Sequence, residues 1–226
     1  MNRLLALATL LSTFSLSGCF DGTPDRVEDF GFEAPIQRVE AFTGSGDIEI
    51  QGDAAAVETT VRARVYGDAT EVVARLDAGV LELRHHCPKR LRRCGVDWIV
   101  VLPSSDEDRI LEASTGSGDI DLFDTQGNII AHTASGDIGL HDVVATELDL
   151  ETGSGDIGAR VQGALESVRA ETGSGDVALR VPSGAYQIHV DTGSGDVSTR
   201  GLSNDPTAER VIEVDTGSGD VALRGS

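Results

Sequence analysis

A short glycine-rich motif recurs along this chain, and its spacing limits the folds that the chain can adopt. Thr-Gly-Ser-Gly-Asp followed by Ile or Val occurs six times, and one further copy reads Thr-Ala-Ser-Gly-Asp-Ile. The motif aspartates are Asp47, Asp119, Asp137, Asp156, Asp176, Asp196 and Asp220. From Asp119 onward they are 18, 19, 20, 20 and 24 residues apart. A repeat with a period near 20 residues is typical of units that stack on one another.

Apolar residues alternate with polar or small ones on both sides of each motif. In the fifth copy, Val168 and Ala170 precede the motif two residues apart, and Val177 and Leu179 follow it with the same spacing. Alternation with period two indicates strands, and the glycines and short polar side chains between them indicate a sharp corner. One such unit cannot bury its apolar face alone, so the units must stack. The sequence therefore predicts an all-β protein with a single β-solenoid domain, β-helix-like, over residues 35–226.

Three segments depart from the regular repeat. The 72 positions that separate the first two motif aspartates predict irregular early coils, with a short helix over residues 70–76. Residues 80–102 contain two strand-like runs around a basic segment and predict a hairpin closed by Cys87 and Cys94. An insertion around residues 203–206 lengthens a late loop, and the end of the chain just after a motif strand predicts an exposed sheet edge.

The first 18 residues have the features of a bacterial lipoprotein signal peptide. One basic residue precedes an apolar run, Leu4 to Leu16, that is too short for an ordinary membrane-spanning helix. The run ends in Leu-Ser-Gly-Cys, which resembles the lipobox of bacterial lipoproteins. This resemblance implies a signal peptide over residues 1–18 and acylation of Cys19 by fatty acids such as palmitate.

The residues after this cysteine bear on the location of the protein. In lipoproteins of Gram-negative bacteria, an aspartate after the cysteine favours retention in the inner membrane, and this chain has Phe20 there. An outer-membrane location in the cell envelope is therefore expected. Residues 19–34 are acidic and predict a tether, and the chain is expected to be anchored to the membrane rather than to span it.

The motif columns, the run from Trp98 to Pro103 and the lipoprotein start together resemble the bacterial putative-adhesin β-solenoid family, whose domains are largely uncharacterised. The resemblance covers roughly residues 35–226. It implies a β-solenoid at the cell envelope. The cysteine-bearing basic segment is the one marked departure from the family pattern.

Asp191 and Asp215 each begin an Asp-Thr-Gly-Ser sequence, which also surrounds the catalytic aspartate of pepsin-like and retroviral proteases. In the other copies this position holds Phe, Ser, His or Glu, so it varies as an outward surface position does. A protease of this class needs two such loops facing each other from two lobes, whereas these two loops are expected on neighbouring coils. The sequence also lacks a Gly-x-Ser-x-Gly elbow. We therefore expect no enzymatic activity.

The motif aspartates raise the question of a metal. Calcium-binding RTX repeats have a period of nine residues, whereas this repeat has one aspartate per coil and a period near 20. Carboxylates stacked ~4.8 Å apart in water repel by about 0.9 kcal/mol per pair, and backbone hydrogen bonds of about 1.5–3 kcal/mol each offset this. We therefore expect no metal and no cofactor. The alternative is a calcium module that uses Asp119, Asp137, Asp156, Asp176, Asp196 and Asp220.

Two cysteines remain after Cys19. Cys87 and Cys94 are seven residues apart, and in an oxidising envelope compartment they predict a disulfide across a loop. The alternative is a zinc or copper site that adds His85 and His86.

Charge is unevenly distributed along the chain. The formal net charge is -20, from 38 acids and 18 bases, which argues against nucleic acid as a partner. One basic cluster is a candidate site for an anionic partner such as an envelope polymer, a lipid headgroup or another protein, and it comprises Arg84, Lys89, Arg90, Arg92 and Arg93. Two further columns predict a charge-patterned outer face without a site, namely Arg160, Arg180, Arg200 and Arg224, and Glu151, Glu171, Asp191 and Asp215.

Taken as a whole, the sequence predicts a non-catalytic, lipid-anchored envelope β-solenoid that presents an interaction surface. The calcium-binding module is one alternative function. An envelope-sensing or regulatory lipoprotein is another.

Overall fold

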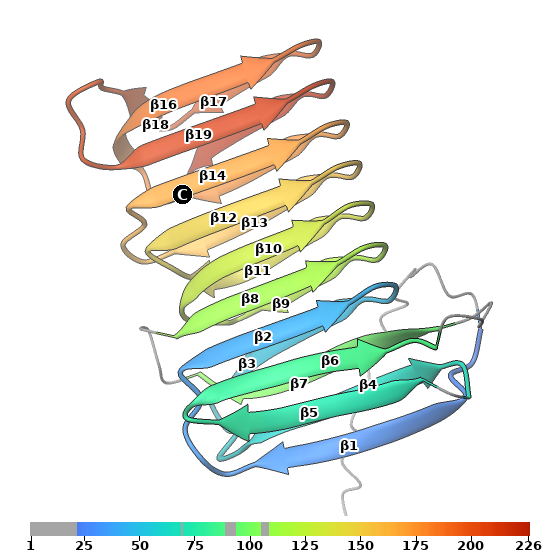
Figure 1. The fold of residues 1–226 in the computed structure, drawn as a ribbon. Helices are drawn as coiled ribbons and strands as arrows, with labels where there is room; N and C mark the ends of the chain where they lie inside the picture. Colours follow the sequence, from blue (N-terminus) through green and yellow to red (C-terminus); the bar gives the residue numbers. More distant parts are fainter. Residues whose placement is uncertain (1–21, 69, 89–93, 105–108) are drawn as a thin grey trace, which may run out of the picture.

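Each glycine-rich motif turns the chain from one sheet into a second, facing sheet. The computed structural model describes residues 22–68, 70–88, 94–104 and 109–226. Within these residues the fold is all-β, with ten strands in each of two sheets that lie face to face along an elongated stack (Figure 1). This confirms the predicted β-solenoid. The candidate lipidation site, Cys19, lies outside the described residues.

From β6 to β18 the strands alternate between the two sheets, so each regular coil contributes one strand to either sheet. The first sheet has the spatial order β1 (Arg26–Phe32), β4 (Thr59–Tyr66), β7 (Gly95–Pro103), β3 (Ile48–Asp53), β9 (Ile120–Phe123), β11 (Ile138–Val144), β13 (Ile157–Gln162), β15 (Val177–Val181), β20 (Val221–Gly225) and β17 (Val197–Arg200). The second has the order β18 (Leu202–Asn204), β16 (Gly184–Thr192), β19 (Val211–Thr216), β14 (Ser167–Thr172), β12 (Glu147–Thr152), β10 (Asn128–Thr133), β8 (Ile110–Thr115), β2 (Arg38–Thr43), β6 (Val80–His86) and β5 (Glu71–Asp77).

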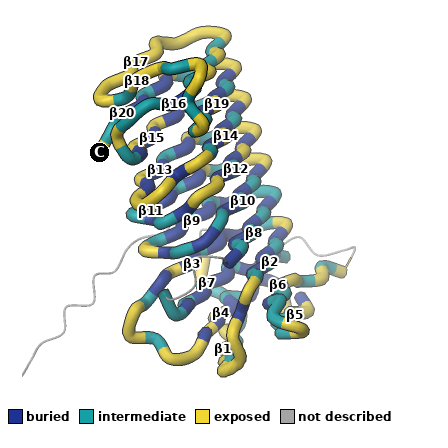
Figure 2. Tube along the Cα trace, turned by 90° about the vertical axis from the view of Figure 1, so that its left-hand side faces the viewer, coloured by how far each residue is buried: buried dark blue, intermediate teal, exposed yellow. Residues whose placement is uncertain are grey.

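Equivalent residues of successive repeats lie side by side in parallel register. Leu148 of β12 pairs with Val168 of β14, and Ile157 of β13 pairs with Val177 of β15. Because side chains alternate across a strand, every second residue of both sheets points into the space between them. These inward columns form one continuous aliphatic core, which is seen as the dark interior of the stack in Figure 2.

The coils do not stack in the order in which the chain makes them. The coil formed by β2 and β3 lies between the coil of β6 and β7 and that of β8 and β9. At the other end, β19 and β20 lie between the coil of β14 and β15 and that of β16 and β17. The prediction of a free sheet edge at the chain end was therefore wrong. The edge strand of the first sheet is β17, and the C-terminus lies short of the end of the stack (Figure 1).

Antiparallel strands close the opposite end of the stack. β1 pairs with β4 and β4 pairs with β7, while β5 pairs with β6 in the other sheet. Two predictions were wrong here. Residues 26–32 of the expected tether form β1, whose Phe30 and Phe32 pack against the core. Residues 71–77 form a strand where a helix was expected, because pairing with β6 outweighs the local helix propensity.

The strand order also shows that the prediction of a basic hairpin was wrong. β6 and β7 belong to opposite sheets, so residues 87–94 connect the two layers instead of turning back within one. Cys87 and Cys94 form a disulfide with an S–S distance of 2.02 Å across this connection. In the described part of the chain, no helix is long and apolar enough to cross a membrane.

Candidate interaction surface

The corners between the sheets are built by the motif residues. Gly118, the second glycine of its motif, has a φ of 147°, and a Cβ atom there would lie 2.2 Å from the carbonyl oxygen of Gly46 on the adjacent coil. The buried Thr115 hydroxyl donates a hydrogen bond of 3.0 Å to this same carbonyl. The same threonine bond recurs in later coils, for example from Thr172 to Gly155. The corners are therefore held together across the stack by side chains.

The motif aspartates form a hydrogen-bonded ladder along the corner edge of the stack. Except in the last aspartate of the ladder, Asp196, the carboxylate Oδ1 accepts a hydrogen bond of 2.7–3.1 Å from the backbone N–H of the aspartate on the next coil. In stack order this aspartate ladder comprises Asp97, Asp47, Asp119, Asp137, Asp156, Asp176, Asp220 and Asp196. The bonds supply the favourable contact that stacked carboxylates require.

Asp97 is a member of the ladder that the motif search missed. It lies in a degenerate repeat in which Asp97 and Trp98 take the places of the motif Asp and Ile. An aspartate followed by alternating apolar residues, Trp98 and Val100, was the sequence signal that could have identified this repeat. The Tyr66 hydroxyl donates a 2.7 Å hydrogen bond to Oδ2 of Asp97. Burial, together with this bond, raises the pKa of Tyr66 to about 12.

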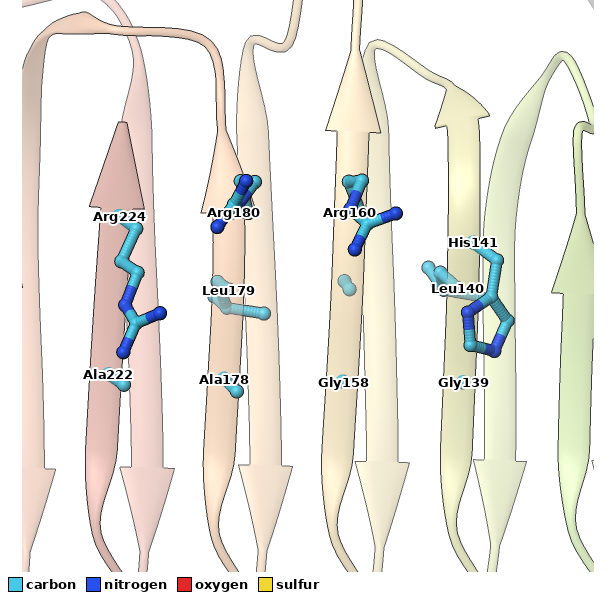
Figure 3. Close-up of a pocket in the computed structure, with 11 residues that line it drawn as sticks. Gly139, Leu140, His141, Gly158, Arg160, Ala178, Leu179, Arg180, Ala222 and Arg224 are labelled. Carbon is cyan, nitrogen blue, oxygen red and sulfur yellow. The ribbon is translucent and has the colours of Figure 1, made fainter. Parts of the chain in front are cut away.

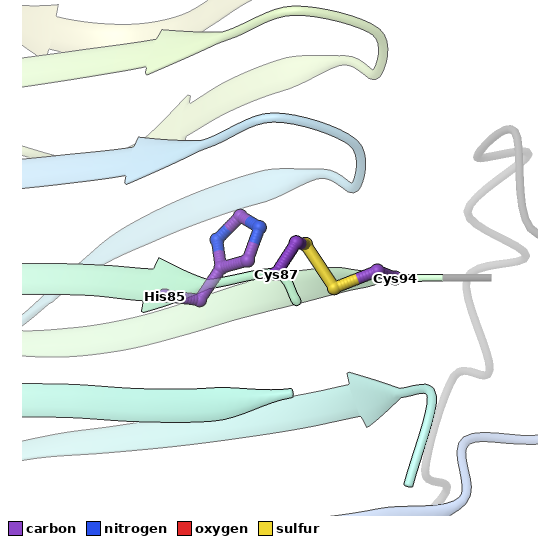
Figure 4. Close-up of side chains that lie close together, drawn as sticks. All are labelled: His85, Cys87 and Cys94. Atoms are coloured by element: carbon purple, nitrogen blue, oxygen red, sulfur yellow. A yellow bond between two sulfur atoms is a disulfide. The ribbon is translucent and has the colours of Figure 1, made fainter. Parts of the chain in front are cut away.

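The calcium alternative gains no support from this geometry. In the part of the chain that the structure describes, three possible metal ligands lie within 4.8 Å of one another at His85, Cys87 and Cys94, and the aspartates form no such cluster. Both sulfur atoms of that cluster belong to the disulfide, so neither is a thiolate (Figure 4). Burial lowers the pKa of the neighbouring His85. His86, the other ligand of the zinc or copper alternative, is not part of the cluster.

Asp47 is the most deeply buried carboxylate of the ladder, at 5% exposure. Burial is the main cause that raises its pKa from 3.8 to about 6, and the neighbouring charges of Asp97 and Asp119 add to the shift. The hydrogen bond from the Asp119 backbone N–H acts in the opposite direction. Because the folded state holds the proton more tightly than the unfolded state, Asp47 stabilises the fold increasingly as the pH falls through 6.

We expect this to appear as a pH-dependent difference between the wild-type protein and Asp47→Asn. Between pH 7.5 and pH 5 the wild type should gain about 1–1.5 kcal/mol of unfolding free energy relative to the variant. Urea unfolding followed by circular dichroism at both pH values measures the difference. Asparagine keeps an oxygen acceptor for the Asp119 N–H, so a parallel pH profile in the two proteins would contradict a raised pKa.

The two sheets carry charge rows of opposite sign on their outer faces. On the first sheet, Arg160 lies beside Arg180, Arg180 beside Arg224, and Arg224 beside Arg200. On the second sheet the same four coils place acids side by side in the order Glu151, Glu171, Asp215 and Asp191. We call these the arginine row and the acidic row. The expected columns are therefore in register, with the arginine row on one face and the acidic row on the other.

Each row borders a shallow surface groove. The groove beside the arginine row has a volume of about 320 Å³ and is lined by His141, Arg160, Arg180 and Arg224 together with Leu140, Leu179 and small residues (Figure 3). The groove on the acidic face has a volume of about 620 Å³ and includes all four acids of the acidic row. Asp191 and Asp215 lie in register on neighbouring strands, which is not the two-lobed arrangement of an aspartic protease.

Of the predicted basic cluster, Arg84 lies within the described residues. Lys89, Arg90, Arg92 and Arg93 lie outside the described residues. Arg84 lies on β6, where it forms ion pairs with Glu82 and Glu40 and stacks over the Phe42 ring at 4.2 Å. Arg84 is therefore engaged within its own sheet.

The fold and these rows can be compared with known proteins. The sequence model of the family described as Toastrack DUF4097 matches residues 112–224, which include the coils that carry both rows. No curated protein shows significant sequence similarity to the chain.

Several solved structures are similar to this one, including those of two bacterial proteins. A putative cell adhesion protein from Clostridium sporogenes is 13% identical, with a TM-score of 0.52 over 89% of this chain and 100% of that chain. A putative adhesin from Bacteroides fragilis is 14% identical, with a TM-score of 0.47 over 88% of this chain and 97% of that chain. At such identity the first similarity concerns the fold alone, and the second score is too low to carry an argument.

Proposed function

Because the chain belongs to the Toastrack DUF4097 family, we propose that it is a non-catalytic, lipid-anchored β-solenoid of the bacterial cell envelope that presents an interaction surface. The observation that carries this proposal is the sorting of charge into an arginine row and an acidic row on opposite faces of the same coils. Ordered rows on rigid strands offer a repeated, fixed set of contacts to a partner. The adhesion description of the Clostridium sporogenes protein agrees with such a role.

The proposed location follows from the signal peptide and lipobox. Acylation of Cys19 would place the solenoid on the membrane by way of residues 20–25, which precede β1. Two or more acyl chains give stable anchoring, whereas one gives only marginal binding. We further propose the outer membrane, because Phe20 follows the cysteine.

Anchoring is tested by fractionating cells that express the full-length protein or Cys19→Ala. We expect the wild type to sediment with membranes and to be labelled by a palmitate analogue. The variant should not be labelled and should be released from the membrane fraction. A double variant, Cys87→Ala with Cys94→Ala, is the matched control, because it removes the other two cysteines and should remain membrane-bound. Equal membrane association of Cys19→Ala and wild type would rule out the lipid anchor.

The partner itself can be sought by cross-linking in intact cells with the anchor present. Recovery of one envelope component with the wild-type protein, and its loss when both charge rows are neutralised, is the result that the proposal requires. Unchanged recovery would show that the rows are not the interaction surface.

A further inference from the structure

Within the described residues, most members of the arginine row have no acidic partner, although many other arginines of this acidic molecule do. Arg26, Arg38, Arg62, Arg75 and Arg169 all form ion pairs with nearby carboxylates. In the row, Arg160 pairs with Asp142 at 3.1 Å. Across the described residues, Arg180, Arg200 and Arg224 form no ion pair. All four arginines are exposed, so their guanidinium groups are open to an external anion.

A strip of small residues lies directly beside this row. Two positions before each arginine stand Gly158, Ala178, Ala222 and Ser198, which are in register with one another along the stack. A Cβ atom built on Gly158 would have no atom within 4 Å, so the surface there is open. At one end of the groove His141 stacks on Phe123, with ring centroids 4.6 Å apart and planes 8° apart. The result is a flat floor with one cationic wall (Figure 3).

The spacing of the row indicates a ligand with regularly repeated negative groups. Parallel strands are about 4.8 Å apart, so the row offers one guanidinium group per step of that length. A 1,4-linked sugar chain advances by a similar step per ring, and a uronic acid carries one carboxylate per ring. Guanidinium groups bind carboxylates through two parallel hydrogen bonds, and sugar rings can lie on a floor that has no large side chains.

Two other occupants fit less well. A second copy of the chain could place its acidic row against the arginine row, but a net charge of -20 on each copy opposes that association more strongly than it opposes binding of an oligomer with one charge per ring. A densely charged polyphosphate or sulfated chain would be repelled more strongly by the aspartate ladder, which runs parallel to the row four residues away, or roughly 13 Å. That separation exceeds the Debye length of ~8 Å at physiological salt, so a chain with one charge per ring is tolerated.

We propose that the arginine row and its small-residue floor bind a linear carboxylated polysaccharide whose chain runs along the stack. This inference deepens the proposed function and rests on it, since it assigns a ligand class to one of the two charge rows. Each exposed contact is weak, so affinity comes from several arginines acting on one chain.

The test compares full-length wild-type protein with the triple variant Arg180→Gln, Arg200→Gln and Arg224→Gln. The probe is a polygalacturonate oligomer long enough to span the row, and binding is measured by calorimetry at physiological ionic strength, where the aspartate ladder is screened. We expect affinity to fall by about tenfold or more in the triple variant, because three exposed charge pairs are lost. The control variant Arg62→Gln, Arg75→Gln and Arg169→Gln changes the net charge equally and should keep wild-type affinity.

Several results would overturn the proposal. These are absence of wild-type binding, equal losses in the two triple variants, or binding of polyphosphate and sulfated dextran as tight as that of polygalacturonate. Self-association of the wild type that the row variant abolishes would assign the row to a second copy instead. Thermal melts of all variants separate lost binding from lost folding. The Cys19→Ala fractionation tests the anchor independently, so failure of the ligand assignment is distinguishable from failure of the proposed location.

Discussion

Gly118→Ala should unfold far more easily than the wild-type protein. The glycine has a φ of 147°, which L side chains rarely adopt, and the new Cβ would lie 2.2 Å from the Gly46 carbonyl oxygen. Backbone strain of this kind costs about 1–3 kcal/mol, and the overlap with a main-chain atom that the adjacent coil holds in place adds to it. We expect a loss of about 3 kcal/mol or more, which corresponds to a fall of roughly 10 °C in Tm by calorimetry.

Gly116→Ala provides the control within the same corner. This first motif glycine lies beside Ala134 of the variant motif, which shows that a Cβ fits at the position. The substitution should therefore cost less than Gly118→Ala, because Gly116 has no positive φ, although its Cβ would lie 2.6 Å from the carbonyl oxygen of Gly44. Similar melting temperatures for Gly116→Ala and Gly118→Ala would mean that the two glycines are not distinguished by conformation.

Trp98→Ala should have a comparably large effect through the core. Trp98 is fully buried, and its indole N–H donates a 3.2 Å hydrogen bond to the Phe42 carbonyl oxygen. Replacing a buried aromatic side chain by alanine typically costs about 3–5 kcal/mol, because a cavity remains. Trp98→Ile, which restores the apolar residue found at this place in other repeats, should still lose part of that stability. Urea unfolding followed by far-ultraviolet circular dichroism measures both losses.

Val197→Ala is the matched control for this core prediction. Val197 occupies the same column after its motif aspartate, but on the terminal coil it is 49% exposed. Its truncation should cost under about 1 kcal/mol. If Trp98→Ala were as mild, the early degenerate coil would not be part of the same continuous core.

The regular part of this fold could be predicted from the sequence because each repeat contains the residue patterns typical of both the corner and the strands. The alignment of motif aspartates gave the inward columns and the register of the arginine and acidic rows, and the structure confirms these. The groove was not foreseen, because it depends on small residues at one column lying beside cations at another. From the sequence, Arg180 was identified only as a member of a charge-patterned outer face, and no role was assigned to Ala178.

The predictions for the irregular parts of the chain were wrong or incomplete for different physical reasons. Residues 71–77 favour a helix locally, and only their pairing with β6 makes them a strand. Asp97 was missed because Val96 stands where the motif has glycine, so this copy does not match the motif. Its aspartate nevertheless accepts the same backbone hydrogen bond as the other aspartates of the ladder. The order of the late coils could not be derived, because copies with nearly identical motifs fit one another in any order.

The interleaved stack order has a consequence for how the chain reaches its native state. Residues 184–200 are made before residues 211–225, yet the later segment lies between them and the body of the solenoid. During synthesis or export, the earlier segment can rest temporarily on β14 and β15, since it carries the same motif, and must then give way. Completion of the array joins β14 to β19 and β15 to β20 across the intervening coil, and pairing over such a sequence separation is slow. In return, the final strand β20 is flanked on both sides, which protects the C-terminus from fraying.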